Sequence, residues 1–177
     1  MPDLKDWTEA SKKAAKEMID KYGPASEVTN DMLIWNNNGY WLKTIVYKNE
    51  VHHNFPSPHA DVLEQWINYR VLPDKFDPLA KFDGSITTNR TNGTISSRSD
   101  KEAMNILALN LAHDIVSGTK SIDQARMDYS IQATAFTKNE RPTYTQKLNF
   151  SADRSAPDPD KPYETEIKIG MDGTDGK

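Results

Sequence analysis

Residues 50–72, EVHHNFPSPHADVLEQWINYRVL, decide how this chain divides into elements. Three of the four histidines lie here, and Pro56-Ser57-Pro58 interrupts the stretch. The serine can cap a helix whose first position is the second proline. Apolar side chains then follow at helical spacing: Val62, Leu63, Trp66 and Ile67. The pattern predicts a helix over 58–71, and residues 51–55 are expected to form a stiff crossing between a strand and that helix.

Two runs rich in aromatic and β-branched residues, 32–35 and 40–47, precede this stretch. They flank Asn38-Gly39, a dipeptide typical of two-residue hairpin turns. That turn pairs Trp35 with Leu42, so both faces of the hairpin carry large apolar groups. Two interpretations remain open. Either the sheet is packed on both faces, or the aromatic groups form an exposed platform for a sugar or peptide. The candidate platform residues are Trp41 and Tyr47, and Trp35 and Tyr40 are further candidate binding residues of this hairpin.

A helix precedes the hairpin, with Asp3 as its expected cap and Gly23-Pro24 as its end. Over residues 10–47 this order resembles the start of the BamE-like (SmpA/OmlA) domains of the bacterial envelope. The residues that carry the likeness are Gly23, Pro24, Trp35 and Tyr47. The resemblance implies a helix that leads through a Gly-Pro turn into a β-meander. It assigns no functional residue, and the helical second half of the chain departs from it. We expect a soluble domain of bacterial type.

The second half of the chain contains further elements. Short helical turns are expected over 74–82, and a polar hairpin is expected around Asn92-Gly93, at a sheet edge. Two capping boxes, Ser99 to Glu102 and Ser121 to Gln124, predict a packed antiparallel pair of helices. This helix pair is expected over 100–117 and 122–138. The alternating residues of 143–150 predict a last strand, and the composition of 152–177 predicts a disordered acidic tail.

Together these elements predict the α+β class. The expected fold is one domain over residues 1–151, with an antiparallel sheet of about five strands and helices largely on one face. The five strands come from two Asn-Gly hairpins and the C-terminal strand. Strands and helices do not alternate regularly along the chain, which argues against a doubly wound parallel fold.

Composition excludes several classes of function. The 177 residues carry a net charge of −4 without a basic stripe, so we expect no nucleic-acid partner. Cysteine is absent, which excludes disulfides, thiolate catalysis and cysteine-bound zinc. No apolar run reaches the length of a membrane span, and the first residues lack a signal-peptide core. We therefore expect a cytoplasmic protein, or a periplasmic one whose leader has been removed.

One group of residues has the composition of a metal site. It comprises Glu50, His52, His53, His59 and Asp61, with His113 and Asp114 far along the chain. Neutral imidazole suits zinc, copper, nickel and iron, and a carboxylate can complete the site. The spacing matches no established metalloenzyme motif.

The expected metal ligands within this group are His53, His59 and His113. His52 and His53 are adjacent, so on an extended backbone they point to opposite faces, and only one can join His59. His113 lies on an apolar helical stripe, where a hydrogen-bonded core histidine is the alternative interpretation.

Two functions follow as hypotheses. The first is a non-enzymatic binding module that combines the aromatic hairpin 35–47 with the histidine-rich crossing 50–59, and His52, His53 and His59 complete its surface. Its partner is a protein or a small molecule. The second is a metal-dependent enzyme that uses His52 or His53 with His59 and His113, with a divalent transition metal as cofactor.

Overall fold

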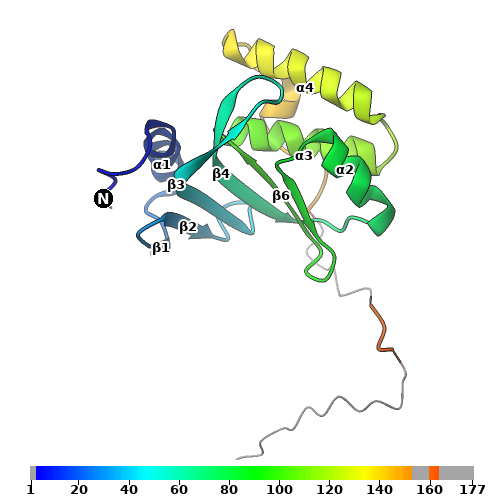
Figure 1. Ribbon diagram of the computed structural model, residues 1–177, viewed down its shortest axis with the longest axis horizontal. Helices are drawn as coiled ribbons and strands as arrows, with labels where there is room; N and C mark the ends of the chain where they lie inside the picture. The colour runs from blue at the N-terminus through cyan, green and yellow to red at the C-terminus, as the bar shows by residue number, and fades with distance from the viewer. Residues whose placement is uncertain (1–2, 153–159, 164–177) are drawn as a thin grey trace, which may run out of the picture.

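The computed structural model describes residues 3–152 and 160–163. The described residues form an α+β fold in which four helices lie on one side of a six-stranded antiparallel sheet (Figure 1). The strand order across the sheet is β1-β2-β3-β4-β6-β5. The strands are β1 (Glu27–Val28), β2 (Met32–Asn36), β3 (Lys43–His53), β4 (His59–Asn68), β5 (Ile86–Asn89) and β6 (Thr94–Ser99). The helices are α1 (Glu9–Tyr22), α2 (Phe76–Phe82), α3 (Glu102–Val116) and α4 (Ile122–Thr137), with short 3₁₀ turns at Pro73–Lys75 and Thr143–Thr145.

The predicted helix 58–71 is wrong, because most of this stretch is the central strand β4. It pairs with β3 on one side, from Lys43 opposite Trp66 to His53 opposite His59, and with β6 on the other. The apolar residues of β4 occur in adjacent pairs, a pattern that suits both a helix and a strand buried on both faces. The neighbouring strands satisfy the backbone of β4 on both sides, which decides the outcome.

The two predicted hairpins differ in accuracy. In the first, Trp35 pairs with Thr44 and Asn36 with Lys43, so the predicted register around a two-residue Asn38-Gly39 turn is wrong. The connection is longer, and the Asn37 N–H donates to the Leu42 carbonyl at 3.0 Å. The second hairpin is confirmed: β5 pairs with β6, and β5 lies at the sheet edge.

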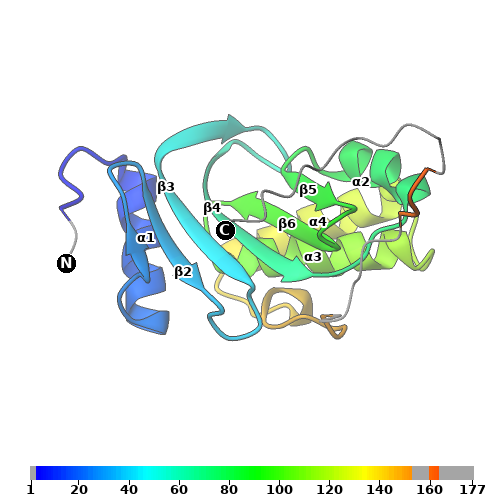
Figure 2. The ribbon, with the colours of Figure 1, turned by 90° about the horizontal axis from the view of Figure 1, so that it is seen from below.

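The helices cover one face of the sheet, as expected, and Figure 2 shows them behind the strands. Helix α1 lies over β3 and β4, and α3 lies over β4 and β6. Helices α3 and α4 pack together, which confirms the predicted helix pair, and α4 also packs against α2. The buried apolar residues form two clusters, one beneath α1 and one around α2, α3 and α4.

Two predicted helix caps are wrong and one is confirmed. Helix α1 is capped by Thr8, whose hydroxyl accepts from the Ser11 N–H, and not by Asp3. The N-cap of α3 is Lys101, and the Glu102 side chain turns into the protein instead of back to Ser99. The Ser121–Gln124 capping box of α4 is present as predicted.

The predicted strand 143–150 is also wrong. This segment contains a 3₁₀ turn and is held by α3 instead of by the sheet. The Asn110 amide donates to the Tyr144 carbonyl at 3.0 Å and to the Lys147 carbonyl at 2.9 Å. Its oxygen accepts from the Asn149 N–H at 2.8 Å. These bonds satisfy backbone groups that a strand would have paired in the sheet. Most of the predicted tail 152–177 lies outside the described residues.

Candidate metal centre

The β3–β4 hairpin places the candidate site. His53 ends β3 and lies directly opposite His59, the first residue of β4. Side chains of directly paired residues project from the same face of a sheet, so the two imidazoles lie together. Asp61 lies two residues beyond His59 and shares that face, whereas His52 belongs to the other. His52 is bound to Asn54 instead, at 2.9 Å, so only one of the adjacent histidines joins His59, as expected.

Asp61 lies between the two imidazoles. Its Oδ1 is 3.0 Å from His59 Nε2, and its Oδ2 is 3.4 Å from His53 Nδ1. One ligand atom from each of these three residues can be chosen so that all lie within 4.8 Å of one another. Asp61 is 2% exposed, while the side chains of His53 and His59 are 18% and 17% exposed. The group is therefore anchored in the interior and retains access to solvent through its histidines.

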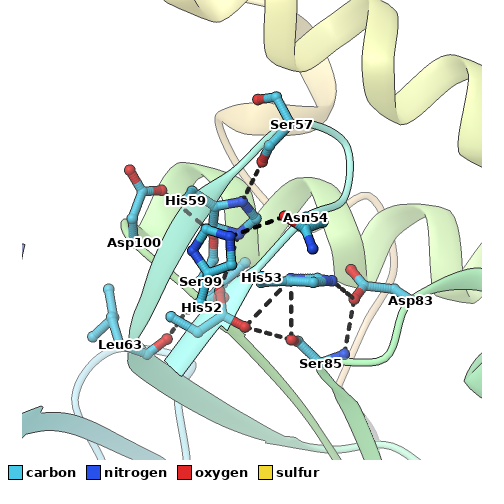
Figure 3. A network of polar contacts seen from close by, with 12 residues as sticks. His52, His53, Asn54, Ser57, His59, Leu63, Asp83, Ser85, Ser99 and Asp100 are labelled. Carbon is cyan, nitrogen blue, oxygen red and sulfur yellow. Dashed lines mark hydrogen bonds and ion pairs between the residues drawn. The ribbon is translucent and has the colours of Figure 1, made fainter. Parts of the chain in front are cut away.

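Each imidazole is also held through its other nitrogen, as Figure 3 shows. His59 Nδ1 lies 2.8 Å from the carbonyl oxygen of Ser57, so this nitrogen is the one that donates. His53 Nε2 lies 3.7 Å from Asp83 Oδ1. When these outer nitrogens carry the protons, the inner nitrogens present lone pairs toward Asp61.

Two further residues support this group and were not predicted from the sequence. They are Asp83 and Ser85, in the α2–β5 connection. The Ser85 N–H donates to Asp83 Oδ1 at 2.8 Å, and the Ser85 hydroxyl donates to Asp61 Oδ2. No motif in the sequence links this connection to the histidines, because more than 20 residues separate them.

The electrostatic environment of the group is negative. Burial lowers the pKa of His59, but Asp61 and the Ser57 carbonyl oppose it, and the resulting pKa is raised. Burial raises the pKa of Asp83, although the Ser85 N–H and His53 oppose this effect. Burial, and then the charges of Asp83, Asp100 and Asp61, hold the pKa of Tyr129 well above its usual value. Such a field stabilises a cation beside Asp61.

The donor set fits a small transition-metal ion. Bonds of about 2.0–2.2 Å to a tetrahedral ion place neighbouring donors about 3.4 Å apart. The contacts of 3.0 and 3.4 Å around Asp61 are close to this value, and the longest separation of 4.8 Å requires a small rotation of a side chain. When His59 is neutral and its proton is on Nδ1, no described residue donates a hydrogen bond to Asp61 Oδ1. A bound cation would satisfy this buried oxygen.

A small pocket adjoins the group. Its volume is about 210 Å³, and it lies between the 56–59 turn, the start of α3 and one side of α4. His59 lines this pocket and also contacts Asp61. The pocket walls are largely apolar, and Tyr129 forms part of them.

The aromatic residues predicted for the binding surface are dispersed. Trp35 and Trp41 are 2% and 1% exposed, and their indole N–H groups donate inside the protein, to the Gly23 carbonyl and to Glu102. Tyr40 is 38% exposed. Tyr47 is half-buried on the sheet face away from the helices, where Arg98 covers its ring and Glu64 accepts from its hydroxyl. These four side chains do not form one surface with the histidines.

His113, the third expected ligand, is not part of the group. Its Nδ1 lies 2.8 Å from the Tyr69 hydroxyl, and its ring stacks on Phe150. Tyr69 follows the far end of β4, ten residues beyond His59 along a strand that rises about 3.3 Å per residue. The alternative interpretation, a hydrogen-bonded histidine packed against aromatic residues, describes His113.

Within the described part of the chain, no helix combines the length and apolar character needed to cross a membrane. No protein-family model, curated protein or solved structure matches the chain.

Proposed function

We propose that this protein is a binding module for a divalent transition metal, held by His53, His59 and Asp61. One observation carries the proposal. The outer nitrogen of each imidazole faces an acceptor, and the inner nitrogens face the two oxygens of the buried Asp61 carboxylate, Nε2 of His59 at Oδ1 and Nδ1 of His53 at Oδ2. Metal-ligating histidines characteristically give their second N–H to a carboxylate or a backbone carbonyl. Asp83 and Ser57 occupy those positions here.

The donor types favour a transition metal over calcium or magnesium. Calcium takes six to eight oxygen ligands, and magnesium prefers oxygen ligands in an octahedron. Two imidazoles and one carboxylate suit zinc, nickel, copper or iron. Each histidine is already close to the orientation that binding requires. Zinc therefore serves as the reference ion for experiments.

The test is metal content and affinity in protein purified without a histidine tag. We expect one zinc ion per chain by elemental analysis after dialysis against zinc, and a rise in the melting temperature. His53→Ala, His59→Ala and Asp61→Asn should each abolish stoichiometric binding. His52→Ala is the matched control, because His52 neighbours His53 but points to the other face of β3, and it should bind like the parent chain.

Two results would contradict the proposal. One is the absence of stoichiometric zinc, nickel, copper or iron under these conditions. The other is equal loss of binding in His52→Ala and His53→Ala, which would indicate nonspecific binding by exposed imidazoles. Circular dichroism of each variant shows whether it has folded before its metal content is compared.

A second candidate function is a metal-dependent hydrolase. The observation that favours it is the number of protein donors, since catalytic zinc sites keep three protein ligands and one open position. A bound metal would lower the pKa of a coordinated water and supply a hydroxide nucleophile. Zinc-dependent cleavage of an activated ester that disappears in His53→Ala and persists in His52→Ala would support this function. Equal cleavage by both variants would remove it.

A further inference from the structure

We propose that Asn92 is a site of spontaneous deamidation, at which the side-chain amide becomes a carboxylate through a cyclic imide. The chain has two Asn-Gly dipeptides, Asn38-Gly39 and Asn92-Gly93, and the fold protects the first from the same reaction. The inference concerns the turn between β5 and β6 and does not depend on the proposed metal site.

The reaction requires only the dipeptide and water. The main-chain nitrogen of the glycine attacks Cγ of the asparagine, and a new N–C bond closes the imide ring. The Cγ–Nδ2 bond breaks, and Nδ2 leaves as ammonia with the proton that the attacking N–H gives up. Water then opens the ring at either carbonyl, to aspartate or to isoaspartate. Glycine favours the attack because it has no Cβ and reaches more backbone conformations than other residues.

The surroundings of Asn92 leave its side chain free to react. Asn92 is exposed, and its side-chain amide has no hydrogen-bond partner in the described part of the chain. Rotation that brings Cγ to the Gly93 nitrogen therefore costs no bond. Water around the exposed side chain also stabilises the negative charge that the attack places on Oδ1.

The attacking nitrogen is held weakly. Gly93 is buried, but its N–H donates to the Arg90 carbonyl at 3.3 Å, which is longer than the usual range for such a bond. The turn ends a hairpin whose first strand, β5, forms the edge of the sheet. Local opening of such a turn costs little free energy, and it exposes the N–H to the base that removes its proton.

The fold opposes the same reaction at Asn38. Its Nδ2 donates to Thr44 Oγ1 at 3.0 Å, so the side chain must break this bond before Cγ can meet the Gly39 nitrogen. Asn38 Oδ1 is buried, and no described residue donates a hydrogen bond to it. The attack would place negative charge on this oxygen where neither water nor a donor stabilises it, which raises the barrier.

Deamidation changes the β5–β6 turn in two ways. Either product adds one negative charge to a chain whose net charge is −4. Isoaspartate also carries the main chain through the former side chain, which lengthens the backbone before Gly93. The pairing of Asn89 with Thr94 and the bond from the Tyr69 N–H to the Gly93 carbonyl, at 2.9 Å, depend on that backbone. The end of the hairpin should therefore open in the isoaspartyl form.

Incubation of the full chain in warm, mildly alkaline buffer tests the inference, with peptide mass spectrometry at successive times. The Asn92 peptide should gain the mass difference between an amide and an acid and separate into aspartyl and isoaspartyl forms. Its rate should exceed that of the Asn38 peptide by about tenfold or more. The same chain unfolded in urea is the control, and there the two dipeptides should react at similar rates.

Thr44→Val removes the acceptor that holds Asn38 and should accelerate deamidation at Asn38 alone. Asn92→Gln should abolish the early acidic species on ion exchange, because glutamine closes the corresponding ring far more slowly. Equal rates at Asn92 and Asn38 in the folded chain would overturn the inference, as would a slower reaction at Asn92. A difference in rate that persists unchanged in urea would also overturn it, because the protection would not come from the fold.

Discussion

Trp41 donates its indole N–H to Glu102 Oε1 at 2.6 Å, in the interior between the two apolar clusters of the core. The same carboxylate accepts from Tyr22 at 2.6 Å, from Gln65 at 3.1 Å and from Lys21. One side chain at the start of α3 thus connects α1, the β2–β3 connection and β4. Since this carboxylate accepts from all four groups, it holds helix α1 and helix α3 in a fixed relation to the sheet.

Replacing Glu102 should destabilise the fold. Glu102→Gln keeps the size of the side chain but turns part of the acceptor into a donor that faces Trp41, Tyr22 and Gln65. We expect a loss of about 1–3 kcal/mol of unfolding free energy, the usual cost of a buried polar group without its partner. Urea denaturation measures it. Glu140→Gln, an exposed position, is the control and should change the unfolding free energy little.

The stability contributed by Glu102 should depend on pH. Burial raises the pKa of this carboxyl. The hydrogen bonds from Lys21, Tyr22 and Trp41 and the charge of Lys21 oppose this effect, and the resulting pKa is lowered. A lowered folded pKa gives stability that is fully present above the ordinary glutamate pKa of about 4.3 and is lost as the pH falls through the folded pKa. Unfolding free energies from neutral to acid pH should therefore fall less steeply in Glu102→Gln than in the parent. Parallel curves would show that Glu102 does not cause the acid sensitivity.

Asp83 should tune the affinity of the proposed metal site without binding the metal. Asp83→Asn removes the carboxylate that faces the outer nitrogen of His53. Loss of such an outer partner typically weakens metal binding about 10–100-fold. Isothermal titration with zinc measures the change. Asp77→Asn, on the exposed surface of α2, is the control and should bind zinc like the parent. Unchanged affinity in Asp83→Asn would exclude this role.

His59 should titrate above an ordinary histidine in the metal-free protein. Burial lowers its pKa, but Asp61 and the Ser57 carbonyl raise it by more. A raised folded pKa gives stability that is fully present below the unfolded pKa of about 6.5 and is lost as the pH rises through the folded value. NMR titration of the ring protons should show a His59 midpoint above the ordinary histidine value of about 6.5. Zinc should remove the His59 titration, because a ligating imidazole must be deprotonated.

Asn110 should control the order of the segment after α4. Asn110→Leu keeps a side chain of similar size but removes two donors and one acceptor that hold Tyr144, Lys147 and Asn149. Hydrogen exchange of the Asn149 amide should accelerate, and the unfolding free energy should fall by about 1–3 kcal/mol. Exchange in the middle of β4 should respond only to the global change in stability. Unchanged protection of Asn149 would show that other contacts hold this segment.

The success of the sequence predictions depended on whether a signal was local. The helix pair α3–α4 and the second hairpin were predicted because their signals are local. Periodic apolar residues and the Ser121 capping box mark the helices, and Asn92-Gly93 marks the hairpin. The 58–71 stretch failed because paired apolar residues suit two kinds of element, and only strands β3 and β6 on either side decide between them. Trp41 was a candidate for the surface until its partner Glu102, 61 residues away, placed it in the interior.

The sequence by itself determined the α+β class, the helices α1, α3 and α4, the second hairpin, and the rule that adjacent His52 and His53 cannot serve one site. Alternating side chains and local capping carry that information within single elements. Tertiary structure alone decided that His59 lies opposite His53, that Asp61 joins them, and that Asp83 and Ser85 support them. Tertiary structure also decided that His113 lies away from this group, beside Tyr69. Strand pairing and the packing of the α2–β5 connection bring these groups together, and both depend on contacts between residues distant in sequence.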